Sequence, residues 1–520
     1  MDPSLKRPDA SRWGDPALVG AIVIGGAALR WVYLGRPSLW WDELVEIAMA
    51  QVGGVSDVLR VVRDGVPPGS GNAGAMPLDY LLLHGWLVLV PDVSPAHLET
   101  HFRLPAFAWS VCALAALAVF ARRHLGRDVG LAATLLLGVS MPHVLYAAEV
   151  RWYSLLVLVT IAHLWAFARL LDAPEVPGRW AWWLGCAAAA VCTAMLSVVP
   201  LGAELAVLAA RTRSSRRVLI ALVASAMLLG VLVAVLASPS LGVTYDRPAS
   251  ARPGLLWTAS LVAWFFAWDQ PVLLVTAALG TVLGLREPRL RPMVAALVCS
   301  FVAIPIAVVL ADWKGYYVHP RHVLFLLPAF VILVAIGIVE TCRWLVGTRF
   351  VLATALALVA ATQAPTVIRY LRNPDPFFAR TKTLRDVRGV VKALPSPALG
   401  RQWLLLAARD SVPNAILARY LRWWGVEHEV VFLGTRELPE ALRLLADGGT
   451  PLDRLVVPPL ATIPVGLTDQ LRQLLDIRIE PISPATALAG ATVVAWEDLP
   501  PTPGLVQRQL LGVETFERPR

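Results

Sequence analysis

The sequence predicts a mainly α-helical polytopic membrane protein with a small C-terminal α/β domain. Of its 520 residues, 57% are hydrophobic and only 16% are charged, whereas soluble proteins carry roughly 25% charged residues. The mean hydropathy is +0.62, and the apolar residues gather in runs close to the roughly 20 residues that span a bilayer. These observations exclude an ordinary soluble globular protein.

The predicted number of membrane spans is about eleven. The candidate segments are residues 17–34, 103–120, 129–147, 154–171, 180–197, 199–211, 218–238, 271–285, 293–311, 323–340 and 350–368. Lys6 and Arg7 precede the first segment, and no small-residue cleavage site follows it. We therefore expect an uncleaved first transmembrane helix rather than a signal peptide.

The basic residues predict the orientation. The net charge is +9, but the arginines cluster in short loops between apolar runs, which indicates membrane orientation and argues against nucleic-acid binding. With those loops in the cytoplasm of a plasma or inner membrane, residues 42–43, 149–151, 312–322 and the C-terminal region all lie outside. The five cysteines fall in or beside apolar segments without a CxxC pair, so we expect neither a disulfide scaffold nor a zinc ribbon.

The first outer loop, residues 35–102, contains predicted interfacial helices. Residues 44–60 have helix-like apolar spacing, and residues 77–90 are apolar enough to lie in the membrane interface. The Gly-rich stretch 65–74 between them predicts a flexible tip. Residues 254–268 predict a further interfacial or re-entrant helix, because a full span there would place the basic loop at 286–291 outside.

The composition changes after residue 368, which divides the chain into a transmembrane domain (1–368) and an extracytoplasmic domain (369–520). The latter predicts a small α/β domain. Its expected strands are 402–408, 429–433, 455–457 and 491–496, and its expected helices are 412–424 and 438–446. No nucleotide-binding, metalloprotease or Ser-His-Asp motif occurs in it.

Two adjacent carboxylates, Asp42 and Glu43, follow a tryptophan pair at the predicted membrane boundary. Carboxylates beside lipid are costly to bury and often functional. The simpler interpretation is an acidic first helical turn that complements the helix dipole, and we prefer it for Glu46. For Asp42 we favour a functional role, because a carboxylate at a partly dry boundary suits a general base. Glu43 is a candidate to assist it.

Two other outer segments carry candidates for phosphate binding. Arg151 has a guanidinium that matches phosphate oxygens, although it and Glu149 could simply neutralise one another. In loop 312–322, Arg321 is the preferred candidate. Lys314, His319 and His322 are weaker candidates in that loop, and contact with anionic lipid headgroups is the alternative. His84 and His163 lie in apolar helices, where a hydrogen-bonded core histidine is more common than a metal ligand.

These segments resemble a known family. Residues 38–43, SLWWDE, resemble the acidic motif in the first outer loop of the integral-membrane C class of glycosyltransferases. The similarity is to the type containing protein O-mannosyltransferases (family 39-like) and aminoarabinose transferases of lipid A. In order, residues 77–84 (PLDYLLLH), 146–153 (YAAEVRWY) and 320–328 (PRHVLFLLP) are similar to its Pro-Pro-Leu-Tyr-Tyr-Leu-Leu, Tyr-Ser-x-Glu-x-Arg-x-Tyr and Arg-Tyr-x-x-x-x-x-Pro segments. The resemblance covers about residues 17–390.

The resemblance implies an inverting transfer of one sugar from a polyprenyl-phosphate donor to a lipid, glycan or protein acceptor on the outer face. It implies Asp42 as the base, with Glu43 beside it. It implies phosphate contact by Arg151 and Arg321. We add Glu149, Tyr153 and His322 as candidate substrate-binding residues. A transporter or flippase of lipid-linked sugars and a glycan ligase or polymerase using lipid-diphosphate donors are the alternatives.

The sequence departs from the family pattern in the second motif. Met76 replaces its first proline, Asp79 replaces its first tyrosine, and the basic residue that often precedes it is absent. Asp79 is therefore a further carboxylate or a metal ligand. The sequence leaves open whether a divalent cation takes part.

Overall fold

The computed structural model describes residues 16–64, 76–91, 94–211, 215–238, 254–313 and 318–381, four short strands after residue 401, and Trp423. The helices of the first half are α1 (Pro16–Trp31), α2 (Trp41–Ala50), α3 (Val55–Asp64), α4 (Pro77–Leu89), η1 (Pro95–His97), α5 (Leu98–His124), α6 (Arg127–Val139), α7 (Met141–Tyr146), α8 (Tyr153–Asp172), α9 (Pro177–Thr193), η2 (Met195–Ser197) and α10 (Val198–Arg211). Those that follow are α11 (Arg216–Ala237), α12 (Leu255–Ala267), α13 (Pro271–Arg286), α14 (Arg291–Trp313), η5 (Pro320–Leu326), α15 (Leu327–Val346), α16 (Val351–Arg372) and α17 (Asp375–Phe378).

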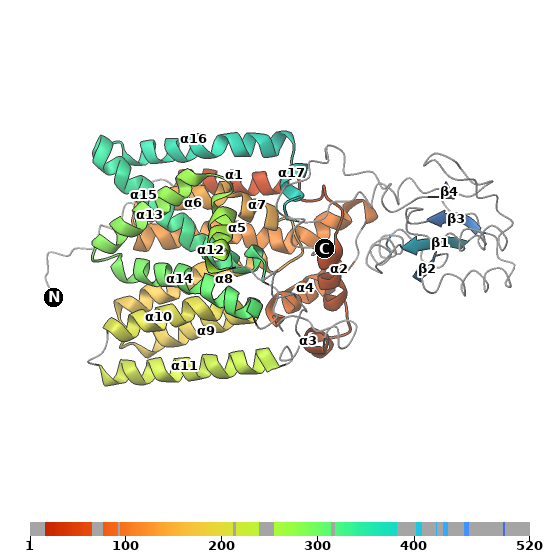
Figure 1. The fold of residues 1–520 in the computed structure, drawn as a ribbon, viewed down its shortest axis with the longest axis horizontal. Coiled ribbons are helices and arrows are strands. Elements are labelled where there is room, and N and C mark those ends of the chain that lie inside the picture. The colour runs from red at the N-terminus through yellow and green to blue at the C-terminus, as the bar shows by residue number, and fades with distance from the viewer. Residues whose placement is uncertain are drawn as a thin grey trace.

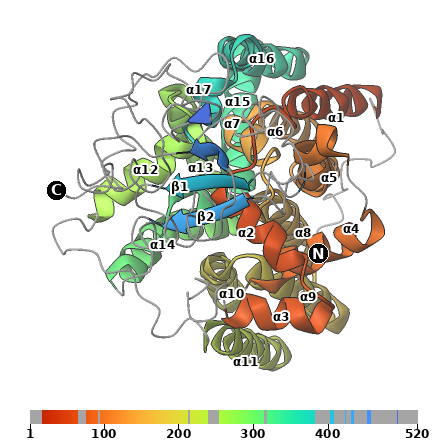
Figure 2. The same cartoon turned by 90° about the vertical axis from the view of Figure 1, so that its right-hand side faces the viewer.

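The long helices form one bundle, with α2, α3 and α4 gathered at one of its ends (Figure 1). Figure 2 looks onto that end. The most enclosed span is residues 320–346, whose apolar window is 94% buried, whereas the windows of α11 and α16 are 17% and 28% buried. Accordingly, α11 and α16 lie on opposite outer sides of the bundle in Figure 1, where their apolar faces can meet lipid.

Each of the eleven predicted spans falls on a helix, but the number of spans is not confirmed. Six helices in the described part of the chain are long and apolar enough to cross a membrane. A seventh span is possible if α12 and α13, which are bent by 103° against each other, count as one. The others have 13 to 17 residues, and at about 1.5 Å per residue they are shorter than a hydrocarbon core of about 30 Å. The bend fits a re-entrant α12 or a broken span.

Two glycines permit a close crossing of α13 and α15. A Cβ atom on Gly280 would collide with the carbonyl oxygen of Leu333, and one on Gly337 would collide with that of Thr276. Both obstacles are backbone atoms, which cannot move aside as a side-chain end can. Small residues at such crossings let helix backbones approach and pack by dispersion forces.

A buried arginine donates hydrogen bonds to the backbone carbonyls at the break between α6 and α7. Pro142, the second residue of α7, has no backbone N–H, so carbonyls near the end of α6 lose their helical donors. The Arg30 guanidinium donates to the carbonyl oxygens of Gly138 (2.7 Å) and Leu137 (3.1 Å) and to Ser110 Oγ (2.6 Å). α1 therefore holds the broken helix in place through a fully buried side chain.

Four parallel strands lie in the C-terminal region, in the order β2-β1-β3-β4. They are β1 (Gln402–Ala407), β2 (Val430–Gly434), β3 (Leu452–Val456) and β4 (Thr492–Val493), and each overlaps a predicted strand. The predicted helices at 412–424 and 438–446 lie outside the described residues, apart from Trp423. The α/β domain and the boundary at 368/369 therefore remain predictions.

Candidate functional site

Glu43 anchors the start of α2. Its carboxylate is fully buried and receives two hydrogen bonds of 2.8 Å from Arg103 of α5. It also accepts from the backbone N–H of Val150 (3.0 Å) and of Trp40 (3.2 Å). Arg103 in turn donates to carbonyl oxygens between residues 34 and 38. Glu43 therefore joins α2, α5 and the turn at residues 147–152, and its surroundings are those of a structural ion pair.

Asp42 lies in a different environment, although it is the adjacent residue. Its Oδ2 is 3.1 Å from Nη2 of Arg321, the second residue of η5. The two side chains are 24% and 14% exposed, and the Arg321 guanidinium stacks over the Trp40 ring at 5.3 Å. Asp42 is thus held by a cation yet remains accessible.

One turn further along α2, Glu46 pairs with Arg151. Its Oε1 is 2.9 Å from Nη1 of Arg151, and its side chain is fully buried. Burial raises the pKa of Glu46 to about 8; Arg151 opposes this shift and Asp79 reinforces it. Since residues four apart share a helix face, α2 presents Asp42 and Glu46 to two arginines that come from distant parts of the chain.

Asp79 adds a third carboxylate from α4. It is buried, and burial raises its pKa to about 7 against the influence of Arg151. α4 is fastened to α2 by His84, whose Nδ1 lies 2.8 Å from the carbonyl oxygen of Ala50, so this histidine has the hydrogen-bonded core role expected for it. Asp79 and Glu46 thus approach the same arginine from two helices.

Four buried donors in this cluster have no hydrogen-bond partner among the described residues. They are the Nε–H groups of Arg151 and Arg321, the hydroxyl of Tyr153 and the indole N–H of Trp40. The Arg151 guanidinium lies 5.8 Å from the centre of the Tyr153 ring, and both arginines act electrostatically on the Tyr153 hydroxyl. Buried donors are seldom left unpaired, and four close together, two of them cationic, are suited to an anion.

Glu149 and the two histidines complete the surroundings. Glu149 is fully buried in the turn that carries Arg151 and acts electrostatically on Tyr153. The backbone N–H of Arg321 donates to His319 Nδ1 (3.3 Å), and that of His319 donates to His322 Nδ1 (3.1 Å). Burial, with Arg321 nearby, lowers the pKa of His319 to about 3, so this ring is neutral and shapes the start of η5.

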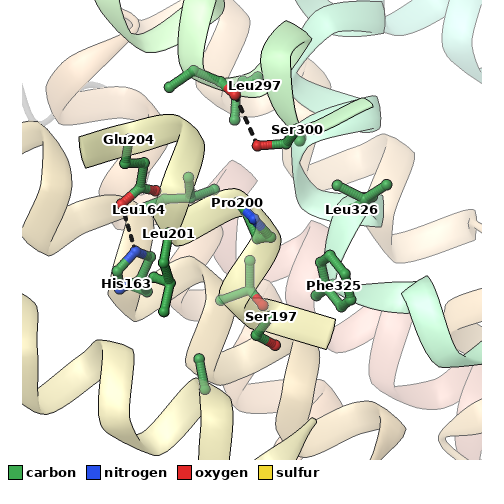
Figure 3. A pocket seen from close by; sticks show the side chains of 14 residues that line it. His163, Leu164, Ser197, Pro200, Leu201, Glu204, Leu297, Ser300, Phe325 and Leu326 are labelled. Carbon is green, nitrogen blue, oxygen red and sulfur yellow. Dashed lines mark hydrogen bonds and ion pairs between the residues drawn. The ribbon is translucent and has the colours of Figure 1, made fainter. Parts of the chain in front are cut away.

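A separate cavity lies inside the bundle, between α8, α10, α14 and η5 (Figure 3). His163 Nε2 lies 2.6 Å from Glu204 Oε2, which also accepts from Trp183 Nε1 at 2.8 Å. His163 is therefore hydrogen-bonded, as expected. In the ranges that the structure describes, no group of three or more His, Cys, Asp or Glu could hold a metal ion.

The structure thus brings together Asp42, Glu149, Arg151, Tyr153, Arg321 and His322. Beside them, Glu43 forms a buried ion pair with Arg103. Lys314 lies outside the described residues. Sequence reasoning assigned Glu46 to an acidic first helical turn, but the first turn of α2 contains Asp42 and Glu43, and Glu46 pairs with Arg151. It left Asp79 undecided. The i, i+4 spacing of Asp42 and Glu46 on a predicted helix was the signal that pointed to Glu46, and no comparable spacing pointed to Asp79.

No protein-family model matches this chain, and no curated protein matches it. Among solved structures, it is similar to ArnT from Cupriavidus metallidurans in the apo state, with 14% identity and a TM-score of 0.50 over 86% of this chain and 94% of that chain. It is also similar to ArnT from Cupriavidus metallidurans bound to undecaprenyl phosphate, with 13% identity and a TM-score of 0.49 over 83% of this chain and 89% of that chain. The similarity to the Archaeoglobus fulgidus oligosaccharyltransferase in complex with Zn and sulfate has 10% identity and a TM-score of 0.48 over 80% of this chain and 62% of that chain. The chain therefore has the fold of the aminoarabinose transferase ArnT, a C-class membrane glycosyltransferase.

Proposed function

We propose that the protein is a membrane glycosyltransferase that moves one sugar from a polyprenyl-phosphate donor to an acceptor hydroxyl on the extracytoplasmic face. The observation that carries the proposal is one cluster containing the accessible carboxylate of Asp42 and the unpaired buried donors of Arg151, Arg321 and Tyr153. A base and an anion site beside each other are what transfer from a sugar phosphate requires. The donor class follows from the motif resemblance.

Asp42 is the base in this proposal. General bases must reach the proton that they abstract, and Asp42 is accessible, whereas Glu43 and Glu46 are fully buried. The acceptor O–H gives its proton to Asp42 while its oxygen bonds to the anomeric carbon of the donor. The bond between that carbon and the phosphate oxygen breaks at the same time, and inversion results from this single displacement.

Arg151, Arg321 and Tyr153 stabilise the departing lipid phosphate. The electron pair of the broken bond stays on the phosphate, so negative charge develops there. Donors aimed at developing charge in a site of low dielectric are effective, and loss of one typically costs about 2.7–4 kcal/mol of barrier. Both arginines already have a carboxylate partner, and their Nε–H groups remain for the phosphate.

Glu43, Glu149 and His322 have supporting roles in this proposal. Glu43 fixes the start of α2 through Arg103. Glu149 lies in the same turn as Arg151, and the His322 ring contacts Trp152, with ring centres 6.0 Å apart. We keep the C-terminal region as an extracytoplasmic domain in this proposal, with lipid, glycan and protein acceptors open.

Transfer of label from a radiolabelled polyprenyl-phosphate sugar to acceptors in native membrane extracts tests the proposal with purified, reconstituted protein. We expect label in an acceptor fraction and release of polyprenyl phosphate. Movement of labelled lipid across the bilayer without transfer would indicate a flippase instead. Activity with a lipid-diphosphate sugar alone would indicate a ligase or polymerase.

A further inference from the structure

Helix α2 carries two carboxylates on one face, and each contacts a different arginine. Asp42 contacts Arg321, and Glu46 contacts Arg151. Only Asp42 is accessible, so Glu46 cannot receive a proton from an acceptor directly. A role for Glu46 must therefore act through Arg151.

The position of Glu46 is fixed by the packing of three helices and by the polar groups around its carboxylate. An apolar cluster of Met49, Val58, Val62 and Tyr80 packs α2 against α3 and α4. The Tyr80 hydroxyl interacts with the Glu46 carboxylate, and Asp79, Asp42 and Arg151 are the charged groups that act on it. Glu46 is thus a buried acceptor whose position is set by three packed helices.

The backbone of Arg151 does not belong to a helix and is held by a hydrogen bond from its N–H to the carbonyl oxygen of Glu149 (2.8 Å). The residue lies in the turn at residues 147–152, between α7 and α8, and its long side chain has many rotamers. The ion pair with Glu46 and the stacking on Tyr153 hold the guanidinium. Because Glu46 takes Nη1, the Nε–H is left for another acceptor.

We propose that Glu46 is a positioning residue for the donor phosphate: it holds Arg151 through Nη1 so that the Nε–H points at the phosphate, and Tyr80 holds the Glu46 carboxylate in turn. This inference rests on the proposed function and deepens it. It assigns to Glu46 a role in binding of the donor and none in proton transfer.

Four variants of Glu46 and Arg151 test the inference by steady-state transfer from the polyprenyl-phosphate sugar: Glu46→Met, Glu46→Gln, Arg151→Lys and the double variant. Glu46→Met removes the ion-pair partner of Arg151 at similar volume. We expect the KM for the donor to rise about 10- to 100-fold, because removing one partner of a buried charge pair costs a few kcal/mol of binding. Glu46→Gln keeps an acceptor oxygen, and we expect a KM within about 3-fold of wild type. In an Arg151→Lys background, Glu46→Met should add less than about 2-fold, because residues that act as one unit are not additive.

Other outcomes would overturn the inference. Multiplication of the two losses would show that Glu46 acts independently of Arg151, by packing. Equal losses for the Met and Gln variants would show that an acceptor oxygen at this position is not what holds Arg151, which would also overturn the inference. If the Met variant does not fold, Glu46→Ala replaces it in the same double-mutant cycle. If neither the Met nor the Ala variant folds while Glu46→Gln is fully active, Glu46 acts in packing and the inference is rejected. Asp57→Asn, on the exposed side of α3, is the control. Absence of transfer by wild type would reject the proposed function itself, whereas transfer with an additive cycle would reject only this inference.

Discussion

Replacing Asp42 by Asn separates catalysis from folding. The amide keeps the shape of the side chain but cannot accept a proton. General bases contribute about 10²- to 10⁴-fold, and a factor of ten corresponds to about 1.36 kcal/mol of barrier. We therefore expect kcat to fall by about two to four orders of magnitude.

The same substitution should leave the fold almost unchanged. The ion pair between Asp42 and Arg321 is partly exposed, and pairs of this kind contribute about 0–1 kcal/mol to stability. Glu43→Gln, one residue away, is the matched contrast. Its partner Arg103 is fully buried, and breaking a buried pair costs about 3–5 kcal/mol, so this variant should unfold at a clearly lower temperature.

The assay combines transfer of label from the lipid-linked donor with thermal unfolding in detergent for both variants. Asp42→Asn should be folded and inactive, and Glu43→Gln should be destabilised. Near-normal transfer by Asp42→Asn would refute the assignment of the base. Equal destabilisation by the two substitutions would refute the reasoning from burial.

Three further predictions concern the scaffold and pH. Arg30→Met should lower the unfolding temperature, because the carbonyls at the end of α6 lose their donor and unpaired buried groups cost about 1–3 kcal/mol each; an unchanged transition would contradict this. Gly280→Ala should lower the free energy of unfolding by about 1–3 kcal/mol, because the added Cβ disturbs the crossing of α13 and α15. Gly230→Ala is the control, since a Cβ there would meet nothing within 4 Å, and it should leave stability unchanged. Similar effects of the two substitutions would rule out close packing as the cause. Because burial raises the pKa of Glu46 to about 8 and that of Asp79 to about 7, the folded state holds protons that the unfolded state releases above about pH 4–5, so unfolding temperatures should fall as the pH rises from 5 to 9. Glu46→Gln should flatten the upper part of that slope, and an unchanged slope would reject the raised pKa.

The sequence by itself located the helices and the candidate polar segments. Hydropathy is a local property along the chain, so every predicted span overlaps at least one helix, and the predicted strands overlap the four that are described. The length of each helix was less predictable. Apolar residues continue through breaks such as the one before Pro142, and in the described part of the chain six or seven segments reach the length of a span.

Only the tertiary structure decided which carboxylates face the arginines. Successive residues on an α-helix point about 100° apart, so the rotation of α2 directs Asp42 and Glu46 to the site and Glu43 to Arg103. Arg321 and Asp42 are separated by 279 residues, and no local pattern encodes that pairing. It depends on how α2, the turn at 147–152 and η5 pack together, because side-chain contacts between distant segments arise only from that packing.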